Sequence, residues 1–148
     1  MGSIEGVLLT PLKIIGGASG NVMHALKKSE ASFQDFGEAY FSTVEQGQVK
    51  GWKRHTKMLL NIIVPAGEIY FVLFDDRKES PSYREMQEVS LSLENYQRLT
   101  VPPGVWMAFK GRGKGLNMLL NIASIAHDPL EAENLPIKND LIPYAGFL

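Results

Sequence analysis

The sequence predicts an all-β domain of the sandwich or barrel type, because short strand-like segments alternate with Pro and Gly turns along most of the chain. The clearest pair is Met58–Val64 and Glu68–Phe74, two largely apolar runs separated by Pro65-Ala66-Gly67. Their length and their β-branched and aromatic residues favour buried strands over helices. With 148 residues, 45% of them hydrophobic, the chain is expected to form one domain with a substantial core.

The N-terminal part predicts short strands and a short helical stretch. Val7–Leu9 and Lys13–Ile15 are strand-like on either side of Pro11. Residues 27–37 carry Ser, Glu, Gln and Asp before Gly37, a pattern that predicts a brief helix. A further strand is expected at Ala39–Val44.

The C-terminal half continues the pattern of strands and turns. Met86–Leu93 alternates polar and apolar residues, as a half-buried strand does, and Gly111–Gly115 is typical of a hairpin tip. Residues 128–148 predict a loosely packed C-terminal tail with a short helix near Pro129–Asn134. Other strands are expected at Leu99–Val101, Val105–Phe109 and Leu116–Ile125.

The composition excludes several classes of function. There are no cysteines, so disulfides, thiolate nucleophiles and cysteine-bound zinc are ruled out. The 15 basic and 16 acidic residues give a net charge of −1, which argues against a nucleic-acid partner. No apolar run is long enough to cross a membrane, and the start of the sequence lacks the pattern of a secretion signal. A cytoplasmic location is therefore expected.

Four groups of residues, spread over residues 4–133, share their order and spacing with one enzyme family. They are Gly6-Val7-Leu8-Leu9 with Gly16-Gly17-Ala18-Ser19-Gly20, then Gly47–Trp52, then Asp75–Tyr83, and finally Leu91–Asn95 with Leu99–Gly104. Together they resemble the dTDP-4-dehydrorhamnose 3,5-epimerase family. The resemblance implies that residues 1–148 form one cupin domain, a jelly-roll β-sandwich barrel with little helix. It also implies a homodimer that acts on a nucleotide-linked 4-keto-6-deoxy sugar without a metal or other cofactor.

The family's catalytic positions carry different residues in this chain. Lys53 occupies the position of the His that acts as the base in the family, and His55 lies two residues further on. His127 occupies the position of the Tyr that acts as the acid. Residues 53 and 55 share one face of a strand, so both side chains are expected to point inward. Histidine titrates near neutral pH, which suits a reaction that moves a proton beside a ketone. We therefore expect Lys53, His55 and His127 to surround one cavity and to act as the catalytic residues.

The resemblance also implies a set of substrate-binding positions. Ser19 replaces a family Arg that would meet the nucleotide phosphates, His24 replaces a Glu, and Lys50 replaces an Arg. The basic run from Lys50 to Lys57 has two interpretations, a cationic lip for a diphosphate or a solvated strand edge protected by charge. The full predicted binding set is Ser19, His24, Lys50, Asn61, Trp106 and Met107.

These observations predict an epimerase or ketoisomerase of surface polysaccharide biosynthesis that acts on a dTDP-type 4-keto-6-deoxy sugar. The alternative is a non-catalytic cupin that binds a sugar nucleotide or a partner protein, which the replaced catalytic positions suggest. A zinc site formed by His24, His55 and His127 is a further alternative, although nothing in the spacing of these residues requires it.

Overall fold

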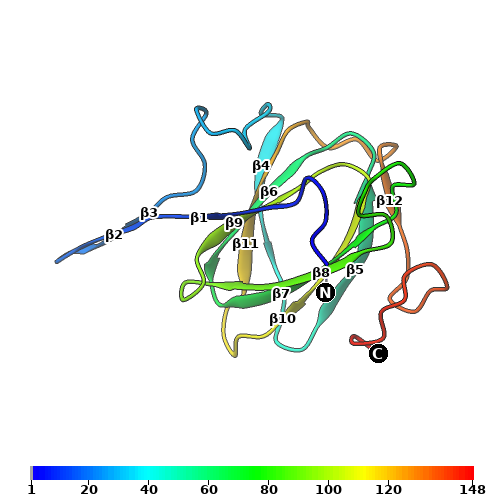
Figure 1. Ribbon diagram of the computed structural model, residues 1–148. Coiled ribbons are helices and arrows are strands. Elements are labelled where there is room, and N and C mark those ends of the chain that lie inside the picture. The colour runs from blue at the N-terminus through cyan, green and yellow to red at the C-terminus, as the bar shows by residue number, and fades with distance from the viewer. Residues whose placement is uncertain (1) are drawn as a thin grey trace.

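The computed structural model describes residues 2–148, and within them every regular element is a β-strand (Figure 1). These residues include no helix that could span a lipid bilayer. The strands are β1 (Leu8–Pro11), β2 (Ile14–Gly17), β3 (Gly20–Met23), β4 (Glu38–Thr43), β5 (Val49–His55), β6 (Leu60–Ala66), β7 (Glu68–Asp75), β8 (Met86–Ser92), β9 (Gln97–Val101), β10 (Val105–Gly111), β11 (Met118–Ala123) and β12 (Ala132–Asn134).

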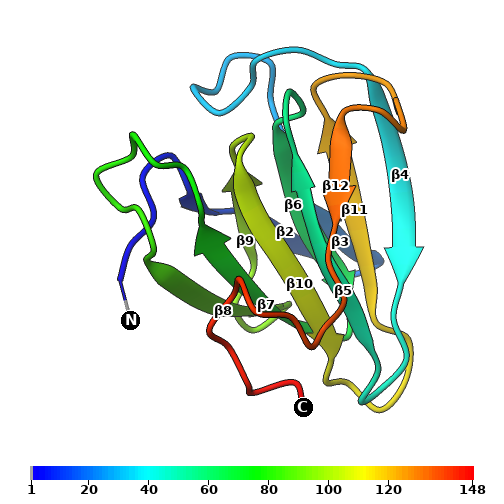
Figure 2. The ribbon, with the colours of Figure 1, turned by 90° about the vertical axis from the view of Figure 1, so that its right-hand side faces the viewer.

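Two five-stranded antiparallel sheets pack against each other (Figure 2). The first has the order β1-β9-β6-β11-β4 and the second has the order β12-β5-β10-β7-β8. Chain neighbours such as β6 and β7 lie in different sheets, which is how a jelly roll is connected. The predicted all-β jelly-roll sandwich is confirmed.

The core fills the space between the sheets at the β7-β8-β9 end. Phe71, Leu73, Leu91 and Leu99 are almost fully buried there. Each such side chain contributes about 1.5–3 kcal/mol of burial free energy. The space between the sheets is therefore filled at this end, and the cavity between them lies toward the opposite edges, β4 and β12.

The helix expected within residues 27–37 is absent, since the described chain forms only turns between β3 and β4. The side chain of Arg98, 1% exposed, explains the difference. Its guanidinium donates to the carbonyl oxygen of Ala25 at 2.7 Å, to the carboxylate of Glu30 at 2.5 Å and to the hydroxyl of Ser32 at 2.8 Å. This loop is therefore held against the outer face of β9 by side-chain hydrogen bonds instead of by its own helical bonds.

The C-terminal segment also differs from its prediction. The prediction of a helix near residues 129–134 is wrong, because Ala132–Asn134 forms β12 and pairs with the edge of β5. The following tail does not pack loosely: Ile142, Tyr144 and Phe147 cover the outer face of the second sheet around Trp52. An unpaired strand edge and an exposed indole both favour such a cover.

Candidate functional site

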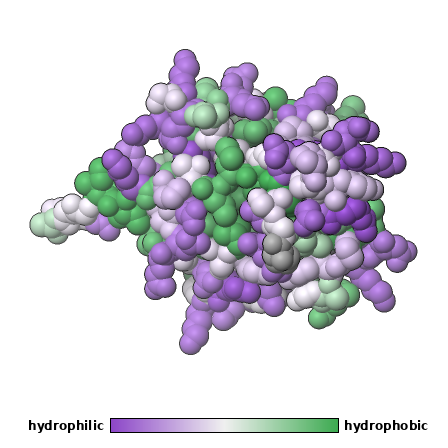
Figure 3. Space-filling view, viewed as in Figure 1, coloured by the Kyte–Doolittle hydropathy of each residue, from purple (hydrophilic) through white to green (hydrophobic). Residues whose placement is uncertain are grey.

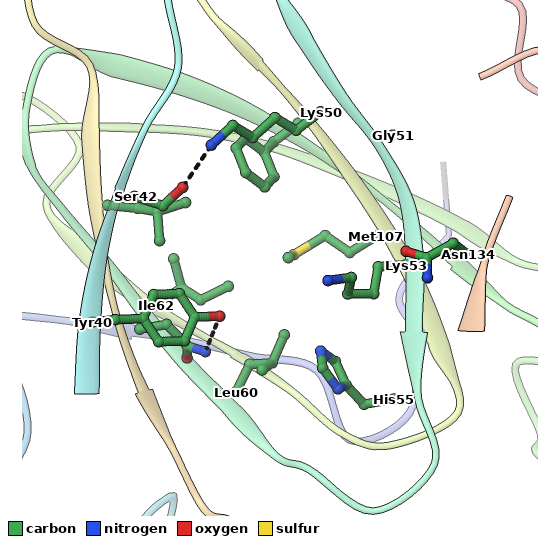
Figure 4. Close-up of a pocket in the computed structure, with 13 residues that line it drawn as sticks. Tyr40, Ser42, Lys50, Gly51, Lys53, His55, Leu60, Ile62, Met107 and Asn134 are labelled. Carbon is green, nitrogen blue, oxygen red and sulfur yellow. Dashed lines mark hydrogen bonds between the residues drawn. The ribbon is translucent and has the colours of Figure 1, made fainter. Parts of the chain in front are cut away.

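An open cavity of about 430 Å³ lies between the two sheets at the β4 and β5 end (Figure 4). The first sheet provides one wall through β4, β6 and β11. The second sheet provides the other through β5, β10 and β12. The lining residues are Tyr40, Ser42, Leu60, Ile62, Leu119 and Asn121 on the first wall, and Lys50, Gly51, Lys53, His55, Met107, Phe109 and Asn134 on the second.

A β-bulge allows two lysines of β5 to face the same cavity. Residues 50 and 53 would point to opposite faces of a regular strand. Lys53 lies opposite Met107, but Lys50 lies opposite Phe109, so β5 has one extra residue in this interval. Both lysines therefore line the cavity, while Trp52 between them is buried on the outer face of the sheet.

His55 is held by a buried carboxylate. Its Nδ1 contacts Oε1 of Glu131, a residue that is 4% exposed and immediately precedes β12. The second oxygen of Glu131 accepts the backbone N–H groups of Lys57 at 3.2 Å and Met58 at 3.3 Å. These contacts fix both the position of the carboxylate and the orientation of the imidazole ring.

The protonation of this pair follows from the environment of Glu131. Burial raises the pKa of its carboxyl, but hydrogen bonds from His55 and from the backbone outweigh burial, and the net pKa is lowered. An ionised carboxylate can only accept hydrogen bonds, so Nδ1 of His55 carries a proton. The other ring nitrogen, Nε2, is left for the cavity that His55 lines.

The opposite wall is polar where it faces these residues. The side-chain amide of Asn121 donates to the hydroxyl oxygen of Tyr40 at 3.1 Å. The ammonium of Lys50 crosses from the second wall and donates to the hydroxyl of Ser42 at 2.8 Å. The cavity therefore has hydrogen-bonding groups on both sides.

The charge of the cavity favours an anionic ligand. Among the described residues that line it, Lys50 and Lys53 are cationic and none is Asp or Glu. Within residues 2–148 the ammonium of Lys53 has no hydrogen-bonding or charged partner, and it points into the cavity in Figure 4. A cation without a partner in a concave site is a ready position for a phosphate or a developing oxyanion.

Two predicted binding residues face away from the cavity. Asn61 lies between Leu60 and Ile62, which line the cavity, so its side chain points to the other face of β6. There it donates to the carbonyl oxygen of Ser32 at 3.1 Å. Trp106 likewise precedes the lining residue Met107 and is buried beneath the C-terminal tail.

Three other predicted residues lie outside the cavity because of the loops that carry them. The expectation that His127 shares the cavity is wrong: it is exposed in the connection between β11 and β12, and that connection delivers Glu131 to the site instead. Ser19 occupies the exposed turn of the β2–β3 hairpin. His24 follows β3, where its carbonyl oxygen accepts the hydroxyl of Tyr96 at 2.8 Å.

The three histidines consequently do not converge on a metal. Across residues 2–148, no three His, Cys, Asp or Glu side chains are grouped closely enough to hold a metal ion. Sequence reasoning also missed Tyr40, Ser42, Asn121 and Glu131. The spacing of Tyr40 and Ser42 on one strand face could have indicated the first two, but Glu131 is brought in by strand pairing that no local pattern reveals.

Comparison with known proteins places the chain among sugar-nucleotide enzymes. A family model described as dTDP-4-dehydrorhamnose 3,5-epimerase matches residues 2–135. The chain is 26% identical over 130 residues to the probable low-salt glycan biosynthesis epimerase Agl13 of Haloferax volcanii, covering 86% of this chain and 83% of that protein.

Solved structures give the same result. The dTDP sugar isomerase of Desulfovibrio desulfuricans G20 is 37% identical with a TM-score of 0.93, and the match covers 96% of this chain and 91% of that chain. The dTDP-4-dehydrorhamnose 3,5-epimerase of Bacillus anthracis str. Ames, solved with TDP and PPi bound, has a TM-score of 0.84 over 94% of this chain and 83% of that one. At 19% sequence identity, this second match shows only that the two proteins share a fold.

Proposed function

Because the chain belongs to the dTDP-4-dehydrorhamnose 3,5-epimerase family, we propose that it is an epimerase or ketoisomerase acting on a dTDP-type 4-keto-6-deoxy sugar in surface polysaccharide biosynthesis. The observation that carries the proposal is the His55–Glu131 pair, which presents a ring nitrogen to a cavity beside the ammonium of Lys53. This arrangement supplies a base and an electrostatic group for an enolate within one site.

In the proposed reaction, Nε2 of His55 removes a proton from the carbon next to the ketone of the sugar. The electron pair of the broken C–H bond moves into the carbonyl group and forms an enolate. The Lys53 ammonium stabilises the negative oxygen, because a positive charge beside a developing oxyanion is worth more in the transition state than in the ground state. Glu131 stabilises the imidazolium that His55 becomes.

The nucleotide part of the substrate would occupy the cationic side of the cavity. Lys50 is exposed and lies three residues before Lys53 on the same wall. Its ammonium could leave Ser42 and contact the diphosphate, in a charge-assisted hydrogen bond of the kind that phosphate sites use. The cationic-lip interpretation of the basic run is thereby preferred for Lys50 and Lys53.

Deuterium exchange tests the proposed chemistry. Purified protein in heavy water, incubated with dTDP-4-keto-6-deoxy sugars, is expected to incorporate deuterium at a carbon next to the ketone. His55→Asn should lower the rate of this exchange by about 10³-fold. His127→Asn changes the same residue type outside the cavity and should retain it. No exchange by the unaltered protein with any of several nucleotide sugars would contradict the proposal.

A binding function without catalysis is the second candidate. It is favoured by the sequence resemblance, which aligns Lys53 and His127 with the positions of the family's base and acid. Thermal-shift measurements with dTDP and nucleotide sugars separate the two functions. Stabilisation by these ligands without deuterium exchange would support the binding function and exclude the enzymatic one.

We further propose that the chain forms a homodimer through the β2–β3 hairpin. This hairpin projects from the body of the molecule as an arm, and its base shows apolar side chains in Figure 3. Ile15 is 53% exposed and Val22 is 62% exposed, which is costly for a monomer. Light scattering should give the mass of a dimer, and the double variant Ile15→Ser/Val22→Ser should give a monomer.

A cytoplasmic location stays a prediction from the sequence.

A further inference from the structure

We propose that Tyr40 is the catalytic acid that delivers a proton to the sugar carbon on the face opposite His55. This inference rests on the proposed function, since it assigns the second proton transfer of that reaction. Inverting a carbon through an enolate requires a proton donor on the side away from the base. A residue on the other wall of the cavity is therefore needed, and His127, outside the cavity, does not supply it.

The position of Tyr40 meets the geometric requirement. It lies on β4, in the first sheet, whereas His55 lies on β5 in the second sheet. Figure 4 shows the Tyr40 hydroxyl directed into the cavity, toward the wall that carries Lys53 and His55. A sugar ring held between the two sheets would thus have the imidazole on one face and the phenol on the other.

Asn121 prepares the Tyr40 hydroxyl to donate. The two residues are direct cross-strand partners of β4 and β11, and the Asn121 amide donates to the phenol oxygen at 3.1 Å. With its oxygen already accepting one bond, the hydroxyl is free to aim its own hydrogen elsewhere. The same N–H would stabilise the phenolate that remains after the proton has left.

The cost of burying Asn121 supports this role. Asn121 is 2% exposed, its Oδ1 has no hydrogen-bond partner within residues 2–148, and the one hydrogen bond that its side chain makes is to Tyr40. A buried amide with an unpaired oxygen lowers stability relative to an apolar residue of similar size. Such a departure from good packing is expected where a side chain serves a site instead of the core.

The other groups on this wall are poorer acids. The first wall consists of Leu60, Ile62 and Leu119 with Tyr40, Ser42 and Asn121, so the hydroxyls of Tyr40 and Ser42 are its only O–H groups among the described residues. A phenol is a far stronger acid than the hydroxyl of a serine. Ser42 moreover accepts a hydrogen bond from Lys50 at the other side of the cavity.

The proton and electron balance of the complete cycle is closed. His55 gains the proton that the sugar carbon loses, and the C–H electron pair becomes the enolate. The enolate carbon then forms a new bond to the Tyr40 proton, and the O–H electron pair stays on the phenolate. Tyr40, 43% exposed, recovers a proton from solvent, and the His55 imidazolium returns its proton to solvent.

The test compares two readouts in Tyr40→Phe, a variant that keeps the ring and removes the hydroxyl. With a dTDP-4-keto-6-deoxy sugar in heavy water, net inversion should fall by about 100-fold or more, the usual contribution of a positioned acid. Deuterium should still enter the recovered substrate, because His55 can remove a proton and return a deuteron to the same face. Phe41→Leu, a change at the exposed neighbouring residue of the same strand, should convert substrate at the normal rate.

Two results would overturn the role of Tyr40 while leaving the proposed function intact. One is normal inversion by Tyr40→Phe. The other is loss of both inversion and exchange by a variant that melts at the normal temperature, since that would make Tyr40 a binding residue. Failure of the unaltered protein to exchange deuterium would instead remove the proposed function, and the inference with it.

Discussion

Two buried carboxylates, Asp75 and Glu131, differ in whether the hydrogen-bond networks around them are complete. Asp75, at the closed end, is fully buried and accepts hydrogen bonds from Arg77, Ser80 and Ser82 at 2.6–3.0 Å. Glu131, at the open end, binds His55, whose second nitrogen has no partner among the described residues and faces a cavity. One network is complete within its own loop, and the other is incomplete until something enters the cavity.

This difference separates structural charge from functional charge. The Asp75 loop also ties down the N-terminal segment, because Arg77 donates to the carbonyl oxygen of Glu5 at 2.5 Å and the N–H of Glu5 donates to Ser82 at 2.8 Å. A closed network of this kind supports the fold. The residues of this loop thus stabilise the domain, whereas the His55–Glu131 pair directs a ring nitrogen at an open cavity.

The largest effect is expected from a substitution that breaks the His55–Glu131 network. His55→Asn should lower the rate of proton exchange by about 10³-fold, within the range for loss of a general base. Its melting temperature should fall less than that of Asp75→Asn, because the Asn amide can still donate to Glu131, which also keeps its two backbone donors. Exchange rates and thermal melting check both parts. An unchanged rate would show that the His55–Glu131 network is not catalytic.

Removing the charge of Asp75 should lower the stability of the protein but not its activity. Asp75→Asn leaves Arg77 without its carboxylate and should lower the free energy of unfolding by about 3 kcal/mol, as for a broken buried pair. The exchange rate per folded molecule should be unchanged. Urea unfolding gives the first quantity and activity at low temperature the second. A large loss of activity in the folded variant would contradict the purely structural role of Asp75.

The loss of stability at low pH is a second test of the Asp75 network. Burial raises the pKa of Asp75, but hydrogen bonds from Arg77, Ser82 and Ser80 outweigh burial and hold the pKa well below its usual value. A lowered folded-state pKa stabilises the protein above the unfolded value, near pH 4, and this stability is lost as the pH falls toward the folded value. The loss should be on the order of 1.4 kcal/mol per pH unit below about pH 4.

Asp75→Asn provides the control for that loss of stability at low pH. Because the amide does not titrate in this range, its unfolding free energy should fall less steeply with decreasing pH than that of the unaltered protein. The lowered pKa values of Glu30 and Glu131 act in the same direction and should leave a residual slope. Parallel curves for the two proteins would mean that Asp75 contributes no acid-labile stability.

The smallest expected effect concerns binding at the open end. Lys50→Met should raise the KM for a dTDP-sugar, or the Kd for dTDP, by about tenfold through loss of one charge-assisted contact, with little change in kcat. Lys114→Met is the matched control, because Lys114 is exposed in the turn after β10 and does not line the cavity. Equal affinities of the two variants would argue against a phosphate contact at Lys50.

Local sequence determined much of the fold and part of the site. The apolar runs that became β6 and β7 predicted buried strands through their length and residue types. The alternation of β8 predicted a half-buried strand, because a strand buried on one face has a period of two. The same period predicted that Lys53 and His55 share a face, and both line the cavity. Strand alternation also could have excluded Asn61 and Trp106, each of which is next to a residue that points inward.

Only the tertiary structure decided how the site is completed. An extra residue in β5 turns Lys50 inward, the pairing of β12 brings Glu131 to a histidine 76 residues earlier, and the packing of the two sheets sets Tyr40 across from both. The same pairing leaves His127 outside. These outcomes depend on which strand edges meet and in what register, and that choice is set by the free energy of the whole packed domain instead of by the residues next to one another in the chain.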